Sequence, residues 1–526
     1  MKRKFLLAAG VALSPLAGLA GILPSCPATP VAADLVNRCT PEVTFYMGGA
    51  SVQAAAVTRA LLTPGLIFDP TKPFAKVRDT AQSVSGSGST TTQLPAGKDG
   101  NTIAFVGYGA SGTGTAAGKR IAVIYNKASG SFGGVRQLLV PKAPLDENTT
   151  LQLTSRVDQK AGTGKGVLAC NISSVASDTV APQADSKMGY STFLCDTEAV
   201  FATGWGGDKM MSMSLALSDL RPSEATPGVI AKWKDSDFPS VSTGMQGFGV
   251  IVSPALYTAL IAKEVAAGHL PPACLSSEVV GTGLADTLHA LCQPNLPNAD
   301  YTALITGRVL TADAFLGTQG DSHSLILARG TDVVGAQAAS NIFFANQAGV
   351  AAKVKDRATD NAPTVLAGNP ANPAQAKLYG DLSVFEKSSS ADVVATVGGA
   401  PATSYALGVV PLEYRYSTVR ANSGLAGALY VKLGGISPNL ADVAGTLVVD
   451  GTMRVAIQNG YPMVYTLQAI TSAKLAEPYA TLAAKLITAV KDPAADLPGV
   501  AYTGSSAADK NTPYQRANSN FAPLSR

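Results

Sequence analysis

Apolar runs of strand length alternate with helical stretches along this chain, and the alternation limits the fold more than any other feature. The strand-like runs occupy residues 43–46, 102–106, 121–125, 325–327, 407–410 and 463–467. Helical patterns lie at residues 51–62, at 478–490 and in a stretch that ends at Phe344. Strands that alternate with helices predict an α/β architecture with largely parallel sheets.

The longest apolar run after the N-terminus shows how strand and helix are joined. It covers residues 247–262 and contains Ser253 followed by Pro254. Serine is a strong N-cap residue, and proline is well tolerated at the first position of a helix. The run therefore predicts a buried strand at 249–252, then a helix that Ser253 caps.

Composition sets broad limits on the function. The chain has 526 residues, which predicts about three folding units. Hydrophobic residues make up 46%, enough for real cores, but charged residues make up only 14%. The net charge is +4, and Lys2, Arg3 and Lys4 supply three of those charges. A chain without a basic stripe gives no indication of a nucleic-acid partner.

The N-terminus has the pattern of a secretory signal. A basic start is followed by an apolar segment at residues 5–20, which is short for a membrane span and contains a proline. We expect a signal peptide at 1–20, with cleavage after Ala20 or as late as Ala33. Lipidation of Cys26 is a third possibility. The mature protein is expected to be periplasmic or secreted and not membrane-spanning.

The cysteine count also fits an exported protein. An even number of cysteines in such a chain favours disulfides over a free thiol or a metal site. Sequence alone allows fifteen connectivities, but close spacing favours neighbours along the chain. No CxxC pair is present, so no metal site is predicted. The six cysteines, expected to pair in this order, are Cys26, Cys39, Cys170, Cys195, Cys274 and Cys292.

Motifs of catalysis and cofactor binding are weak. Residues 107–112 match the GxGxxG pattern, but a second strand follows where a dinucleotide site requires a helix. A hairpin-like loop is the better interpretation. The chain has no GxSxG motif, and its three histidines have no flanking catalytic pattern. The sequence therefore predicts neither a cofactor nor an enzyme.

Small residues gather instead at four junctions between a strand and a helix. These junctions lie at residues 48–51, 129–134, 217–219 and 329–337. A helix N-terminus offers unpaired N–H groups and the positive end of the helix dipole. One junction alone is ordinary capping, but several that converge form a site for an anion.

In this order, the four junctions resemble loops of the periplasmic phosphate-binding protein of phosphate ABC transporters. GGASV at 48–52 resembles that family's GAGAT loop, and IYNKASGSFGGVRQL at 124–138 is similar to its second ligand loop. ALSDLRP at 216–222 and LARGTDVVGAQAASNIFF at 327–344 resemble its third and fourth. The resemblance covers about residues 43 to 490.

The resemblance implies an α/β fold of two lobes in the type 2 arrangement of periplasmic binding proteins, with a hinge and long insertions. Lobe I would comprise residues 34–235 and 460–526, and lobe II residues 236–459. The implied function is capture of inorganic phosphate or a related oxyanion between the lobes. An ABC permease is the implied partner.

The same resemblance implies the ligand residues. Asp219 would accept the proton of a protonated oxyanion and repel sulfate, and Arg329 would be the counter-charge. Nine residues would line the site: Ala50, Ser51, Val52, Ser131, Asp219, Arg329, Gly335, Ala336 and Gln337.

The fourth junction departs from the family pattern. Val334 and Ala336 stand where the family has Ser and Thr, so two hydroxyl donors are lost. The amide of Gln337 is a partial replacement. An alternative function therefore stays open: a secreted protein on the same scaffold that acts through its surface, with a degenerate ligand site. The low charge and the long polar insertions suit that alternative.

Overall fold

The computed structural model describes most of the regular core of the chain and none of the first 25 residues. The described residues are 26–37, 39, 41–79, 102–126, 131, 134, 135, 138, 178–180, 188–195, 213–219, 238–275, 291–330, 334–345, 377–379, 381–387, 390–414, 425–443, 446–449, 460–492, 500–501, 515–516 and 524–525.

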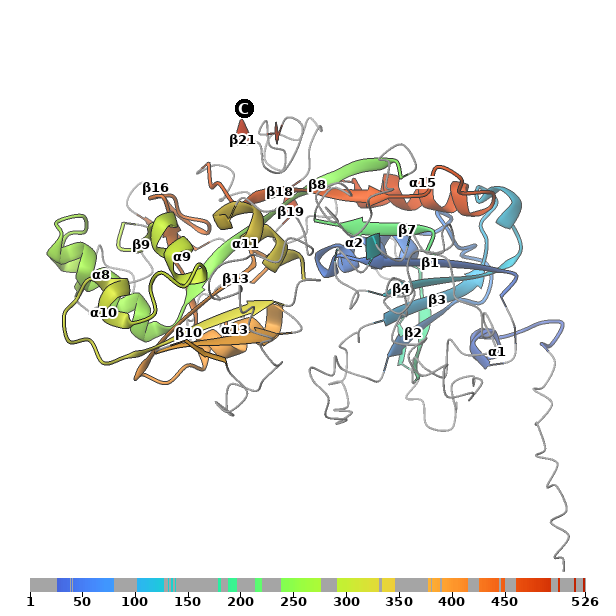
Figure 1. Ribbon diagram of the computed structural model, residues 1–526. Coiled ribbons are helices and arrows are strands. Elements are labelled where there is room, and N and C mark those ends of the chain that lie inside the picture. The colour runs from blue at the N-terminus through green and yellow to red at the C-terminus, as the bar shows by residue number, and fades with distance from the viewer. Residues whose placement is uncertain are drawn as a thin grey trace, which may run out of the picture.

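One mixed sheet of fifteen strands runs through this structure, with helices packed on its faces (Figure 1). It has two halves. The first half follows the order β18-β7-β1-β4-β3-β2-β6-β5. Its strands are β1 Val43–Gly49, β2 Ala75–Asp79, β3 Thr102–Tyr108, β4 Arg120–Asn126, β5 Asp178–Val180, β6 Tyr190–Cys195, β7 Leu215–Ser218 and β18 Val464–Ile470.

The second half follows the order β11-β12-β10-β13 and lies on the other side of β8. Its central strand β10 runs parallel to both neighbours, β12 and β13. The bounds are β8 Ser240–Val252, β10 Ser324–Gly330, β11 Lys377–Tyr379, β12 Leu382–Lys387 and β13 Ser404–Pro411. Short strands β14 Leu429–Tyr430 and β19 Val500–Ala501 also pair with β8.

Strand β8 joins the two halves. Its residues 240–247 pair with β18 in the first half, and its residues 248–252 pair with β13 in the second. Its last ten residues are all buried, so the connection is part of the core. Strand β8 has thirteen residues and changes its pairing partner midway. It therefore fixes how the two halves of the sheet are oriented relative to each other.

Helices pack on both halves. On the first half, α2 (Ala54–Leu62) and α15 (Tyr479–Val490) pack together against one face, while α1 (Ala32–Asn37) packs on β2 and β3. In the second half, α11 (Gly335–Ala345) and α13 (Ser390–Gly398) pack on the sheet around β10 and β13. Helices α8 Pro254–Ala266, α9 Asn298–Ile305 and α10 Ala312–Leu316 lie beyond them (Figure 1).

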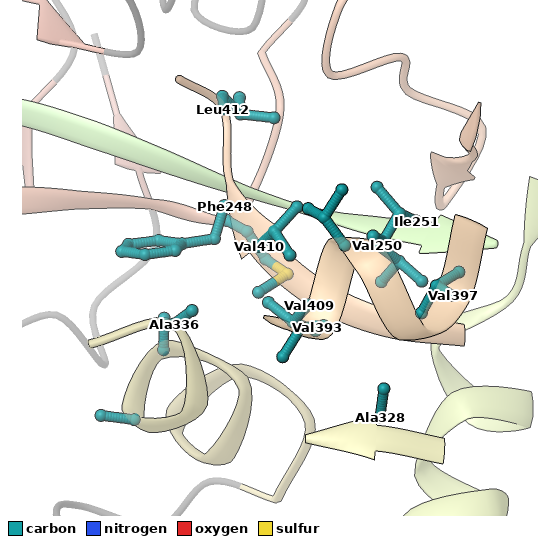
Figure 2. Packing of buried hydrophobic residues seen from close by; sticks show 14 of the residues in the cluster. Phe248, Val250, Ile251, Ala328, Ala336, Val393, Val397, Val409, Val410 and Leu412 are labelled. Atoms are coloured by element: carbon teal, nitrogen blue, oxygen red, sulfur yellow. The ribbon is translucent and has the colours of Figure 1, made fainter. Parts of the chain in front are cut away.

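The core of the second half forms where β8, β13 and α13 meet. Figure 2 shows Val250 and Ile251 of β8 close to Val410 of β13, with Val393 and Val397 on the helix beside them. All five side chains are almost completely buried. Fully burying a Val or Ile side chain contributes about 1.5–3 kcal/mol to stability, so this cluster anchors the C-terminal part of β8.

The predicted α/β architecture and its two halves are confirmed. Ser253 does cap its helix, because its side chain accepts a hydrogen bond from the N–H of Leu256. The GxGxxG segment is indeed the turn of a hairpin, since β3 and β4 pair antiparallel on either side of it. The expectation of largely parallel sheets is wrong. That hairpin and the antiparallel strands β8 and β18 make the sheet mixed.

Two of the three predicted disulfides are confirmed. Cys26 pairs with Cys39, and Cys274 pairs with Cys292. The third predicted pair, Cys170 with Cys195, lies outside the residues whose side chains are described. Among the described residues, no helix has both the length and the apolar character that a membrane span requires.

We expect the mature protein to begin at or before Cys26. Cleavage after Ala33 would remove Cys26 and the start of α1, whose Leu35 and Val36 are buried in the core. Lipidation would consume the Cys26 thiol. Intact mass and a non-reducing peptide map of the exported protein check this. An N-terminus at Asp34 would contradict it.

The same disulfide predicts a stability effect. Cys39→Ser should lower the free energy of unfolding by roughly 3 kcal/mol, the loss typical of opening a loop of this size. Denaturant unfolding of the variant and of the oxidised parent measures it. Equal stability would show that the Cys26–Cys39 pair does not form in the exported protein.

Candidate functional site

Three strands of the first half end at the same edge of the sheet. Strand β1 is parallel to both β4 and β7, so their carboxyl ends point in one direction. Ala50, Ser131 and Asp219 follow these ends along the chain. The carboxyl ends of parallel strands are where ligands bind in open α/β sheets, and three of the four predicted junctions converge here.

The first junction is held by hydrogen bonds to its neighbours. The N–H of Ala50 donates to the carbonyl of Leu217 at 2.7 Å, and its carbonyl accepts from the Tyr125 hydroxyl at 2.5 Å. Gly49 has φ 128°, and a Cβ there would overlap the Leu217 carbonyl, so the approach to β7 requires glycine. The backbone groups of Ala50 are thus used to fix this loop.

Ser51 and Val52 begin the short 3-10 helix Ser51–Gln53 that leads into α2. Val52 is buried, and the structure does not describe the side chain of Ser51. The first N–H groups of a helix have no partner within that helix. Because Ala50 is committed elsewhere, the N–H groups of Ser51 and Val52 are what this loop can offer to a ligand.

Ser131 and Asp219 bring the second and third junctions together. The Ser131 hydroxyl donates to Oδ2 of Asp219 at 2.5 Å. Asp219 is only 5% exposed, and its Oδ1 has no hydrogen-bond partner among the described residues. Burial raises the pKa of Asp219 to about 6, although the Ser131 hydrogen bond acts in the opposite direction. Among the described residues, the carboxyl group therefore keeps one acceptor without a partner at the strand ends.

Gly335 adds the fourth junction, which comes from the second half. A Cβ at Gly335 would overlap Oδ2 of Asp219 and lie 2.9 Å from Oγ of Ser131. The start of α11 therefore lies directly against the Ser131–Asp219 pair. Glycine also allows the second junction to approach the first, because a Cβ at Gly134 would be 2.8 Å from the Gly48 carbonyl oxygen. The four predicted junctions meet at one place.

The N-cap residue of α11 offers no side-chain acceptor. The carbonyl of Val334 accepts from the N–H groups of Gln337 and Ala338, which makes Val334 the N-cap residue. A valine side chain has no acceptor for the N–H groups of the first turn. The positive end of α11 therefore faces the carboxyl group of Asp219.

Ala336 and Gln337 do not turn their side chains to this meeting point. Ala336 is 3% exposed and packs in the hydrophobic core of the second half, as Figure 2 shows. Gln337 donates from its amide nitrogen to Asn341, one turn along the helix, at 2.8 Å. The amide that was expected to replace lost hydroxyls is thus engaged within α11.

Arg329 lies at the end of β10 and is partly buried. Burial raises the pKa of Tyr301 in α9 to about 12, and the Arg329 charge and the Ser340 side chain act in the opposite direction. The Arg329 charge therefore acts on α9, and the end of β10 that carries Arg329 lies against the start of α11.

Sequence reasoning missed Tyr125, which bonds to Ala50, and Glu413, whose charge acts on Tyr125. Burial raises the pKa of Tyr125 far above its usual value, and the charges of Asp219 and Glu413 raise it further. The charges of both carboxyl groups therefore act on the Tyr125 hydroxyl. Glu413 follows β13, so it comes from the second half. The positions of both residues, at the ends of predicted strands, were the signal that could have revealed them.

Comparison with known proteins adds little. No protein-family model matches the sequence, and no curated protein matches it.

Among the described residues, no group of three or more His, Cys, Asp or Glu is arranged to hold a metal ion.

Three solved structures show a weak likeness. An ABC-type phosphate transport receptor from Vibrio cholerae has 9% identity and a TM-score of 0.28, over 54% of this chain and 76% of that one. A putative phosphate ABC transporter substrate-binding protein with bound phosphate from Clostridium perfringens has 11% identity and a TM-score of 0.27. The match covers 56% of this chain and 80% of that one. A possible phosphate binding protein from Planctomyces limnophilus has 13% identity and a TM-score of 0.26. The match covers 53% of this chain and 69% of that one. Values this low carry no weight for fold or ligand.

Gly335→Ala is expected to separate the two halves at this point. The added methyl group would overlap the carboxyl group of Asp219, and the rigid strand ends leave little room for it to move. The radius of gyration by small-angle scattering should increase, although alanine favours the helix by about 1 kcal/mol.

Gly112→Ala is the matched control. The glycine has an ordinary backbone conformation, and its Cβ would meet only the flexible end of Lys485. This control should leave the radius of gyration unchanged. An unchanged radius in Gly335→Ala as well would contradict the close contact between Gly335 and Asp219.

The raised pKa of Asp219 predicts a pH-dependent stability. The pKa is about 6 in the folded protein and about 3.9 in an unfolded chain, so the folded state binds the proton more tightly. The contribution of Asp219 to stability should therefore be highest below pH 4 and fall as the pH rises to 6. A difference of two pKa units between the folded and unfolded states corresponds to about 3 kcal/mol in the free energy of unfolding.

Asp219→Asn isolates this contribution, because it removes the titration and keeps the shape. The free energy of unfolding of the parent minus that of Asp219→Asn, measured by urea titration from pH 4 to pH 7, should fall over that window. A difference that is constant with pH would show that Asp219 titrates normally in the folded protein.

Proposed function

We propose that this protein is an extracytoplasmic solute-binding protein that captures phosphate or a related oxyanion between its two halves. The observation that carries the proposal is the contact among Ser131, Asp219 and Gly335. It joins strand ends of the first half to the helix N-terminus of the second half at a buried point. A ligand held there would touch both halves and hold them together.

The chemistry of the contact among Ser131, Asp219 and Gly335 suits an oxyanion that carries a proton. The N-terminus of α11 favours negative charge, and the N–H groups of Ser51 and Val52 are further donors. The Oδ1 atom of Asp219 is a buried acceptor without a partner in the described structure. A protonated oxyanion satisfies it with an O–H donor, whereas a fully deprotonated anion meets a second negative charge.

Export and a transport partner belong to the same proposal. The N-terminal signal pattern and the two disulfides support an oxidising compartment outside the cytoplasm. The proposed partner is an ABC permease that receives the captured anion. Arg329, at the end of β10, is proposed as the counter-charge of the ligand.

Calorimetric titration of the purified protein with phosphate and with sulfate, after removal of bound ligand, tests the proposal. We expect phosphate to bind and sulfate to bind at least about 100-fold more weakly, because sulfate has no proton for Asp219. Asp219→Asn should reduce this discrimination, since the amide can also donate to sulfate. Binding of no oxyanion at all would overturn the proposed function.

An acidic residue on the surface provides the control for charge. Asp69→Asn, in a loop of the first half, removes a carboxylate that bonds only locally to Thr71 among the described contacts. It changes the net charge of the protein by the same amount as Asp219→Asn. Its discrimination between phosphate and sulfate should equal that of the parent.

A further inference from the structure

Helix α11 belongs to the second half, but it also bonds to the first half one turn after it begins. The hydroxyl of Tyr465 in β18 donates to the carbonyl of Ala339 in α11 at 3.0 Å. Both residues are completely buried. A buried hydroxyl without a partner is costly, and a backbone carbonyl has two lone pairs, so Ala339 can accept from Tyr465 and still take part in its helix. This hydrogen bond therefore joins the two halves inside the core.

The ring of Tyr465 is held by the strand that the two halves share. Tyr465 pairs with Gln246 in β8, and its ring packs on that of Phe248 with 5.7 Å between the ring centroids and 60° between the planes. Phe248 is the first residue of β8 that pairs with β13, and it is completely buried. A tilted pair of aromatic rings in a close-packed core has little freedom to move. The Tyr465 hydroxyl is thus a fixed point at the place where β8 changes partners.

Two contacts attach α11 to the first half. Gly335 lies directly against Asp219, and Ala339 accepts from Tyr465 four residues later. An α-helix rises about 1.5 Å per residue, so the two contacts are roughly 6 Å apart along the helix axis. A helix held at one point can pivot about it, whereas a helix held at two points has a fixed direction. The Tyr465 bond therefore keeps the N-terminus of α11 directed at Asp219.

We propose, resting on the proposed function, that Tyr465 is a positioning residue that sets the affinity for any oxyanion held between the two halves. It acts through α11, because its hydroxyl stabilises the arrangement in which Gly335 and Asp219 meet. A ligand that binds only this arrangement binds more weakly when the population of the arrangement falls. Tyr465 makes its bond to the helix and not to the oxyanion. It therefore sets how tightly an anion binds and leaves the preference for phosphate over sulfate unchanged.

Tyr465→Phe tests the proposal, since it removes the hydroxyl and keeps the ring against Phe248. Calorimetric titration should show that phosphate and sulfate both bind about 5-fold more weakly than to the parent, the effect of one lost hydrogen bond. The ratio of the two dissociation constants should stay the same. Dissociation constants equal to those of the parent overturn the inference. A changed ratio also overturns it, because Tyr465 would then act on the choice of anion.

Tyr430→Phe is the matched control. Tyr430 is also completely buried, and its hydroxyl bonds to the carbonyls of Pro411 at 3.0 Å and Tyr414 at 2.7 Å, all within the second half. The variant loses a buried tyrosine hydroxyl without touching the link between the halves. Its affinities for phosphate and sulfate should equal those of the parent. Equal weakening in Tyr430→Phe and Tyr465→Phe would show a general loss of stability and would overturn the positioning role.

Hydrogen exchange of the ligand-free protein, measured by mass spectrometry, tests the same role without an anion. Amides at residues 335–345 should exchange about 5-fold faster in Tyr465→Phe, because α11 opens more often when one of its two attachments is lost. They should be unchanged in Tyr430→Phe. Failure of the parent to bind either oxyanion overturns the proposed function, and the exchange of α11 then decides this inference alone. An exchange rate in Tyr465→Phe that equals that of the parent or of Tyr430→Phe overturns it.

Discussion

Strand β8 belongs to both halves of the sheet, and the position of every residue at the candidate site depends on it. Its first part is fixed by the ladder with β18, and its second part by the ladder with β13. Thr243, in the first part, also donates to Gln53 at the start of α2. The same strand therefore links the junction of the two halves to the segment that follows Ala50. A change in the course of β8 would move α11 relative to Asp219.

The meeting of the two halves places a carboxyl group where solvent does not reach. Removing the Asp219 carboxylate from water is unfavourable, which is the physical cause of its raised pKa. The Ser131 hydrogen bond and the positive end of α11 offset part of this cost. Buried carboxyl groups with a raised pKa are found at functional sites more often than in ordinary cores. At such a site, a ligand that carries a hydrogen-bond donor can satisfy the acceptor that the protein leaves without a partner.

Much of this architecture was predictable from local pattern. The alternation of apolar runs and helices, the Ser253–Pro254 cap and the near-neighbour disulfides each depend on residues close in sequence. The four junctions were also visible, because glycine and small hydroxyl residues mark strand ends. Their convergence depended on a family resemblance, since Ser131 and Asp219 are 88 residues apart in the chain. The antiparallel course of β8 and β18 depends on pairing across the whole molecule, which no local pattern records.

Side-chain direction was the part that sequence could not give. Ala336 and Gln337 lie in the segment that resembles a ligand loop, yet one packs into the core and the other bonds to its own helix. Helix geometry decides this, because successive residues on α11 point about 100° apart and face different neighbours. Gly335, which begins the helix, is the residue beside Asp219, while the side chain of Val334 lies against Gly330. The chemistry that this end of α11 presents to Asp219 is thus set by the backbone at Gly335 rather than by a side chain. Backbone N–H groups at a helix N-terminus favour an anionic ligand, and Asp219 opposite them favours one that keeps a proton.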